Sequence, residues 1–174
     1  MRFLCSGEAL ASLLATLKGR DYMWGGEVTY REQRMQLNIY VDGASWGNPG
    51  PAAIGAVIKD GKQKELANIS QYIGEATNNQ AEYQAVIAAL KSAARFKAAE
   101  VTLYLDSELV ARQLAGSYKV RNLFLFPLYK EAAELCKEFA NLSIVHIGHD
   151  ENVEAHALAK AALRKFMRQE VEGT

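Results

Sequence analysis

The chain has 174 residues, and its 20 Lys and Arg balance 20 Asp and Glu, so the formal net charge is zero. This length suits one well-packed core and is short for two domains. The balanced charge excludes a long-range electrostatic attraction to nucleic acid, so any such binding depends on local charge. Cys5 and Cys136 have no metal-ligand spacing, and we expect free thiols rather than a disulfide. Because no stretch approaches the ~20 apolar residues of a membrane span, we expect a cytoplasmic protein without membrane contact.

Residues 1–34 differ in pattern from the rest of the chain. Ser6 is a suitable N-cap for a short amphipathic helix that ends at Gly19. The apolar face of this helix consists of Ala9, Leu10, Leu13, Leu14 and Leu17. We expect 1–34 to be an N-terminal extension that caps the core, with docking on a partner as the alternative. Residues 35–174 then form the main domain.

From residue 37 the pattern is typical of strands. Apolar and polar residues alternate over 37–42, which predicts a strand with one buried face. A turn cluster at 43–50 precedes a second strand at 53–59. Asp60-Gly61 is a hairpin signal, and the partner strand covers 66–73. Three antiparallel strands therefore come first.

Helices and strands alternate in the second half of the chain. The predicted helices cover 78–96, 107–116, 127–139 and 152–168, and the further strands cover 101–105 and 142–147. Hairpin strands followed by alternating helices and strands favour an α/β fold, with a mixed sheet flanked by helices.

Three acidic residues are predicted to converge. Asp42 and Asp106 each end a predicted strand, on the face opposite to that strand's aliphatic residues. Ligands of α/β sheets gather at the carboxyl ends of strands, and Glu82 lies one turn into a helix from which it can reach the same crevice. Converging carboxylates repel one another unless a cation neutralises them, and oxygen ligands select Mg²⁺ or Mn²⁺. From spacing alone, ordinary turn or cap residues are the more common interpretation of an aspartate at a strand end.

Four segments in order resemble the motifs of type 1 ribonucleases H. They are 42–50 (DGASWGNPG), 77–82 (TNNQAE), 105–110 (LDSELV) and 152–163 (NVEAHALAKAAL). The resemblance implies the ribonuclease H-like fold, a five-stranded mixed β-sheet with three antiparallel strands first, then parallel strands, flanked by α-helices. It also implies an endoribonuclease that hydrolyses the RNA strand of RNA–DNA hybrids.

The resemblance assigns the catalytic residues. Asp42, Glu82 and Asp106 match three acidic ligands of a site that holds two Mg²⁺ or Mn²⁺ ions with substrate. These ions hold the scissile phosphate, activate a water and stabilise the leaving oxygen. His146 matches a histidine proposed to assist product release in many members.

The resemblance also assigns nucleic-acid-binding residues. The backbone of Gly43, Ala44 and Ser45 is expected to meet the RNA 2′-hydroxyl groups, which distinguish RNA from DNA. Asn48 and Asn79 match positions that read the minor groove, and Asn78 lies beside Asn79. Thr77 and Asn122 match a pocket for a DNA-strand phosphate.

The chain departs from the family at the fourth acidic position, where it has His156 in place of an aspartate. In one interpretation neutral His156 coordinates metal or donates a hydrogen bond in a working site. In a second, the site has lost a metal and binds hybrids without cleavage. In a third, Asp150 or Glu154 substitutes, although helical neighbours two residues apart face different directions. We take His156 as a catalytic residue and metal ligand.

Three functions therefore compete. An endonuclease for RNA–DNA hybrids leads, ahead of a non-catalytic hybrid-binding module and a nuclease acting on double-stranded RNA. The basic helix with which some members grip the hybrid is missing before Pro127, where only Lys119 and Arg121 remain. Retention of all three acids favours an enzyme, because a pure binder gains nothing from clustered like charges. The sequence does not identify protein partners.

Overall fold

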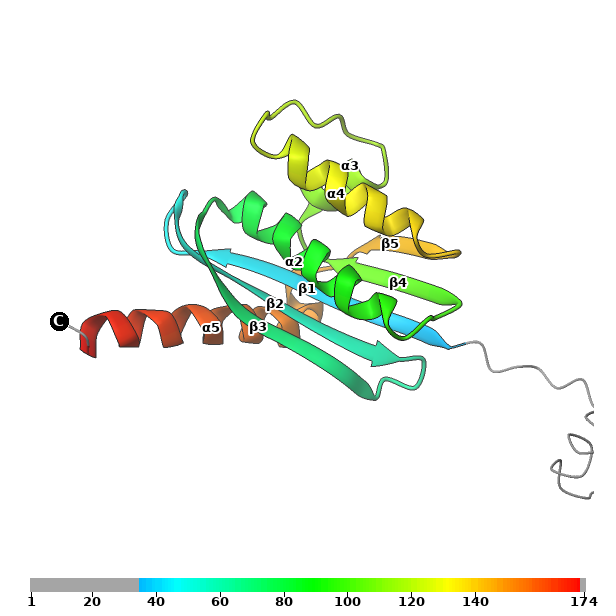
Figure 1. The fold of residues 1–174 in the computed structure, drawn as a ribbon, viewed down its shortest axis with the longest axis horizontal. Helices are drawn as coiled ribbons and strands as arrows, with labels where there is room; N and C mark the ends of the chain where they lie inside the picture. Colours follow the sequence, from blue (N-terminus) through cyan, green and yellow to red (C-terminus); the bar gives the residue numbers. More distant parts are fainter. Residues whose placement is uncertain (1–34, 173–174) are drawn as a thin grey trace, which may run out of the picture. The chain divides into compact units, whose positions relative to one another are not determined.

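The structure is a computed structural model that describes residues 35–172 of the chain. The prediction of an N-terminal extension with an amphipathic helix falls on residues 1–34, outside the described part. Figure 1 shows one twisted sheet with helices on both faces. Within the described residues, no helix combines the length and apolar character needed to cross a membrane.

The sheet has five strands. In chain order they are β1 (Gln36–Ser45), β2 (Gly50–Asp60), β3 (Glu65–Ala76), β4 (Glu100–Leu105) and β5 (Leu142–His146). Their spatial order is β3-β2-β1-β4-β5, with β1, β2 and β3 antiparallel. β4 runs parallel to β1, and β5 runs parallel to β4. The predicted mixed sheet, with its antiparallel strands first, is confirmed.

Four α-helices and one 3₁₀ turn are described. They are α2 (Asn78–Ala94), α3 (Glu108–Leu114), α4 (Phe126–Lys137), η1 (His149–Glu151) and α5 (Val153–Glu172). Thr77 caps α2 in a capping box with Gln80, and Ser107 caps α3, because their hydroxyl groups accept free backbone N–H groups of the first turn. α2 and α4 lie over one face of the sheet and α5 over the other (Figure 1).

The main core lies between the sheet and α2. Leu37, Ile39 and Val41 point to this side from β1 and are essentially inaccessible to solvent, as the alternating pattern predicts. Each fully buried side chain of this size contributes ~1.5–3 kcal/mol relative to an exposed one. Because successive side chains of a strand point to opposite faces, the alternate residues of β1, including Asp42, lie on the other face of the sheet.

The predicted turn at 43–50 is too long. β1 continues to Ser45, which pairs with Ala52, and the connection to β2 is only residues 46–49. Small residues suggest a turn locally, but antiparallel pairing with β2 holds them in the strand. Asp42 therefore lies inside β1 rather than at its end. What ends beside it is the pairing of β1 with β4, whose last pair is Val41 and Leu105.

The remaining element boundaries differ from the predictions by a few residues. β3 reaches Ala76 because pairing with β2 resumes beyond a bulge and continues to Gly50. α5 begins at Val153 and continues to Glu172, beyond the predicted end. The η1 turn before α5 was not predicted, since a three-residue helix leaves no periodic signal.

Candidate active site

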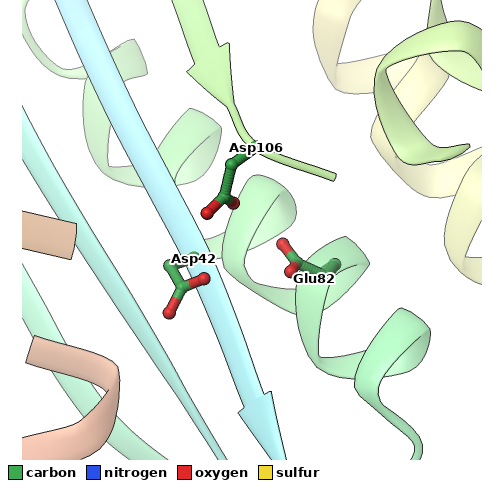
Figure 2. A group of neighbouring side chains, drawn as sticks. All are labelled: Asp42, Glu82 and Asp106. Carbon is green, nitrogen blue, oxygen red and sulfur yellow. The ribbon is translucent and has the colours of Figure 1, made fainter. Parts of the chain in front are cut away.

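The acidic residues lie where the parallel strands β1 and β4 stop pairing. Asp42 follows Val41, the last β1 residue that pairs with β4, and Asp106 follows Leu105, the last residue of β4. Figure 2 shows their carboxylates approaching one another, with Glu82 directed toward them from α2. β1 thus supplies one acid, the residue after β4 a second and α2 the third.

Two glycines let the helices on both faces of the sheet approach the acidic residues. A Cβ atom on Gly43 would overlap the α2 backbone at Glu82, so glycine allows the helix to bring this acid beside Asp42. Gly55 is the β2 partner of Asp42 in the sheet. A Cβ atom there would overlap the α5 backbone one residue before His156. Because these two glycines have no Cβ atom, α2 can lie close to β1 and α5 close to β2.

The three acids form one compact cluster. Asp42, Glu82 and Asp106 each offer a carboxylate oxygen, and these oxygens lie within 4.8 Å of one another. Asp42 and Glu82 are each only 4% exposed. One Glu82 oxygen, Oε2, is buried and has no hydrogen-bond partner among the described residues. A buried carboxylate oxygen without a donor is costly, so the cluster is suited to a ligand of positive charge.

Burial and repulsion from neighbouring acids raise the pKa values of Glu82 and Asp42. Burial, then the charges of Asp42 and Asp106, raise the pKa of Glu82 well above its usual value. Burial, then the charge of Asp106, also raise the pKa of Asp42, and His156 partly opposes this shift. A divalent cation reverses both effects, because it favours the charged carboxylates. Oxygen ligands from Asp and Glu suit Mg²⁺ and Mn²⁺.

His156 touches the edge of the acidic cluster. Its Nδ1 atom lies 3.1 Å from Asp42 Oδ2, and the ring is largely buried by its surroundings. His156 therefore reaches the cluster through Asp42, from the first turn of α5. Asp150 and Glu154 are not part of the cluster of described residues, and Glu154 instead forms an ion pair with Lys59 at 2.8 Å.

The structure places His149, rather than His146, against an acidic side chain of the cluster. His149 Nδ1 lies 2.8 Å from Asp106 Oδ2, and its ring meets that of His156 edge-on at 4.3 Å between centroids. His146, the histidine selected from the sequence, lies at the end of β5 with Nε2 3.3 Å from the backbone oxygen of Asp106. Both histidines precede α5 in the sequence, but His146 ends β5 whereas His149 begins the η1 turn. The η1 turn therefore decides which of the two side chains reaches the Asp106 carboxylate.

The candidate groove-reading residues lie at the β1–β2 connection and the start of α2. Asn48 Oδ1 accepts a hydrogen bond from the backbone N–H of Asn78 at 3.2 Å. This bond leaves the Asn48 amide nitrogen as a donor, which is what the acceptors in the minor groove require. Asn78 is exposed and Asn79 half-buried. Of residues 43–45, Gly43 is buried, while Ala44 and Ser45 are partly accessible.

The predicted phosphate-pocket residues have local capping roles. The Thr77 hydroxyl accepts from Gln80 N at 3.3 Å and donates to Gln80 Oε1 at 3.0 Å. Asn122 Oδ1 accepts from Phe124 N at 2.8 Å and Leu125 N at 3.2 Å, before α4. No hydrogen bond between described residues joins Thr77 to Asn122, so their pairing in one pocket stays a prediction.

Sequence reasoning missed Asn152. The sequence pattern assigns it only to the start of the last helix, yet its side chain is 1% exposed and donates to Asp106 of the acidic cluster. The available signal in the sequence is its position between two histidines, at 149 and 156, while its burial is seen only in the structure.

Several known proteins resemble this chain in sequence and in fold. A family profile described as reverse transcriptase-like matches residues 40–162. The chain is 44% identical over 128 residues to ribonuclease HI of Halobacterium salinarum, which covers 74% of this chain and 64% of the relative. It is 34% identical to ribonuclease H of a Chelativorans species, covering 77% of this chain and 89% of the relative.

The solved structure of LC11-RNase H1 in complex with an RNA/DNA hybrid superposes with a TM-score of 0.72 at 42% identity. The match covers 75% of this chain and 99% of that one. This chain spans between 36% and 64% of the length of several curated relatives that it matches.

Proposed function

Because this chain belongs to the ribonuclease H family, we propose that it is a metal-dependent endonuclease that hydrolyses the RNA strand of RNA–DNA hybrids. The observation that carries the proposal is the convergence of Asp42, Glu82 and Asp106 within 4.8 Å, with a buried Glu82 oxygen that lacks a donor. Support for the substrate comes from LC11-RNase H1, whose structure holds an RNA/DNA hybrid.

The three acids of the cluster and His156 would together hold the proposed metal ions. Asp42 contacts His156 and belongs to the cluster with Glu82 and Asp106, so it would hold metal together with them. Mg²⁺ or Mn²⁺, when bound, supplies charge to a scissile phosphate and lowers the pKa of an attacking water. Glu82 and Asp106 would supply further oxygen ligands, and His156 would offer a nitrogen ligand or a hydrogen bond beside them.

His149 is the candidate for proton handling near the leaving group. Its imidazole is bonded to the Asp106 carboxylate, and its side chain is 60% exposed, so it can exchange protons with solvent. Histidine is suited to this task because its ordinary pKa lies near neutrality. We assign it this role in addition to His146, which stays a sequence-based expectation.

Discrimination between RNA and DNA is assigned to the end of β1. Ala44 and Ser45 are partly accessible and lie two and three residues after Asp42. Backbone groups at this point are candidates to contact a 2′-hydroxyl group, which RNA has and DNA lacks. Asn48, Asn78 and Asn79 follow on the same side as candidate groove contacts.

The test is cleavage of a labelled RNA–DNA hybrid by the full chain, with Mg²⁺ or Mn²⁺, beside matched duplex DNA and double-stranded RNA. We expect cuts in the RNA strand of the hybrid, dependence on the metal and an intact DNA duplex. Absence of hybrid cleavage with either metal, together with tight hybrid binding, would replace this proposal by the non-catalytic module that His156 brings into consideration. Equal cleavage of double-stranded RNA would favour a nuclease for that substrate.

A further inference from the structure

We propose that Asn152 is a positioning residue of the metal site, which orients the Asp106 carboxylate and links it to Asp42 and His156. The inference rests on the proposed metal site and goes beyond the family resemblance, which assigns Asn152 no role. Asn152 ends the η1 turn and immediately precedes α5, so it lies where the loop after β5 enters the crevice.

The side chain of Asn152 joins the two strands that carry the acids. Its Nδ2 atom donates to the Val41 backbone oxygen at 2.7 Å and to Asp106 Oδ1 at 3.2 Å. Val41 directly precedes Asp42 on β1. One amide group therefore bridges β1 and the end of β4, at the point where their own pairing stops.

The contacts also fix the orientation of the amide. Both N–H bonds of Asn152 are engaged, whereas its Oδ1 atom is buried without a hydrogen-bond partner among the described residues. The reversed amide would place this oxygen against the Val41 oxygen and the Asp106 carboxylate, where every neighbour is an acceptor. Two donations therefore outweigh one unpartnered acceptor. Neither aspartate nor a hydrophobic residue of similar shape offers these two donors.

The backbone of Asn152 extends the connection to the histidines. Its carbonyl oxygen accepts a hydrogen bond from the backbone N–H of His156, in the first turn of α5, at 3.1 Å. Its own backbone N–H donates to the His149 backbone oxygen at 3.1 Å. His149 holds the second oxygen of Asp106. The Asp106 carboxylate is thus held by a donor from each end of the same short segment.

A carboxylate held in this way presents a fixed geometry to an incoming cation. Groups that orient metal ligands are commonly worth 10–100-fold in metal affinity. We therefore expect loss of the Asn152 amide to weaken Mn²⁺ binding even where the fold is retained. A residue that only fills space would affect stability and leave metal affinity unchanged.

The experiment compares Asn152→Ala and Asn152→Leu with the unchanged chain by calorimetric Mn²⁺ titration without nucleic acid. Leucine fills most of the same volume, so it keeps packing while removing both donors. Asn141→Ala is the matched control, because Asn141 donates an amide hydrogen bond to the Ala99 oxygen at 3.1 Å between other strand ends. Val101→Ala, a buried change at the opposite end of β4, controls for lost stability.

We expect Mn²⁺ affinity to fall about 10–100-fold in both Asn152 variants and to stay unchanged in both controls. In cleavage assays, kcat should fall while KM for the hybrid is retained, because Asn152 is buried away from the substrate. Wild-type Mn²⁺ affinity in Asn152→Leu, with only a lower melting temperature, would overturn the proposal and leave a packing role.

A second measurement uses the unaltered chain and does not depend on variants that fold. In NMR spectra recorded during Mg²⁺ titration, the side-chain N–H resonances of Asn152 should shift in step with metal binding, and those of Asn141 should not. Asn152 resonances that ignore saturating Mg²⁺ would overturn the proposal. Because neither metal titration uses a hybrid, failure of hybrid cleavage alone would overturn the proposed substrate and leave this inference standing.

Discussion

Replacing Glu82 by glutamine should stabilise the metal-free protein. Glu82 is 4% exposed, and its Oε2 atom has no donor among the described residues. Leaving a buried polar group unsatisfied costs ~1–3 kcal/mol, and glutamine removes the negative charge from beside Asp42 and Asp106. A gain of this size corresponds to a rise of about 2–12 °C in melting temperature for a chain of this length.

The gain should depend on pH with a definite sign. The folded-state pKa of Glu82 is raised by burial and by its acidic neighbours, above an unfolded value near 4.3. Between these two values the folded state binds more protons than the unfolded state, so the free energy of unfolding falls as pH rises. Glu82→Gln lacks this loss. Its advantage over the wild type should therefore be absent below about pH 4 and appear as pH rises through that window.

The assay is thermal unfolding of both proteins from pH 4 to 8 in a chelator, repeated with Mn²⁺. At 100 times the dissociation constant, one ion adds ~2.7 kcal/mol to the protein that binds it, so Mn²⁺ should reduce or reverse the difference. Glu131→Gln, which loses only an exposed ion pair with Lys91, is the control and should change little. A Glu82→Gln protein that is less stable than wild type in chelator at every pH would refute this reasoning.

Three further outcomes follow from the site. Asp42→Asn and Asp106→Asn should each lower hybrid cleavage at least 100-fold while circular dichroism shows a retained fold; a normal rate in either would remove that residue from catalysis. Hybrid binding should weaken with added salt, with a shallow slope in a plot of log affinity against log salt, because the chain carries no net positive charge. His156→Asp should raise the ratio of Mg²⁺-supported to Mn²⁺-supported cleavage, because carboxylate oxygen suits Mg²⁺ better than imidazole does. His156→Ala should cleave the hybrid more slowly than either the wild type or His156→Asp. Equal metal preference in all three proteins would make His156 a bystander.

Local sequence determined the elements and their order. The alternation of Leu37, Ile39 and Val41 with polar residues specified a strand with one buried face, since successive side chains of a strand point to opposite sides. The hairpin signal at Asp60-Gly61 and the hydroxyl caps at Thr77 and Ser107 likewise act through neighbours a few residues away. Such short-range rules are visible in the sequence, and these elements were predicted to within a few residues.

The ends of β1 and β3 were less predictable from sequence. Residues 43–45 are small and read as a turn, but pairing with β2 holds them in the sheet. The bulge that carries β3 on to Ala76 also depends on its partner strand. Long-range pairing outweighs weak local preference at such positions.

The sequence by itself determined that Asp42, Glu82 and Asp106 face one crevice, because strand parity and the helical turn direct their side chains. The tertiary structure alone decided which neighbours hold them. His149 rather than His146 contacts the Asp106 carboxylate, and Asn152 bridges β1 and the end of β4, because the η1 turn brings this segment beside both strands. Gly43 and Gly55 matter for the same reason, since the overlap that a Cβ atom would cause involves backbone far away in the sequence. Contacts between residues about 40 to 110 positions apart carry no periodic signal along the chain, so only the packed fold reveals them.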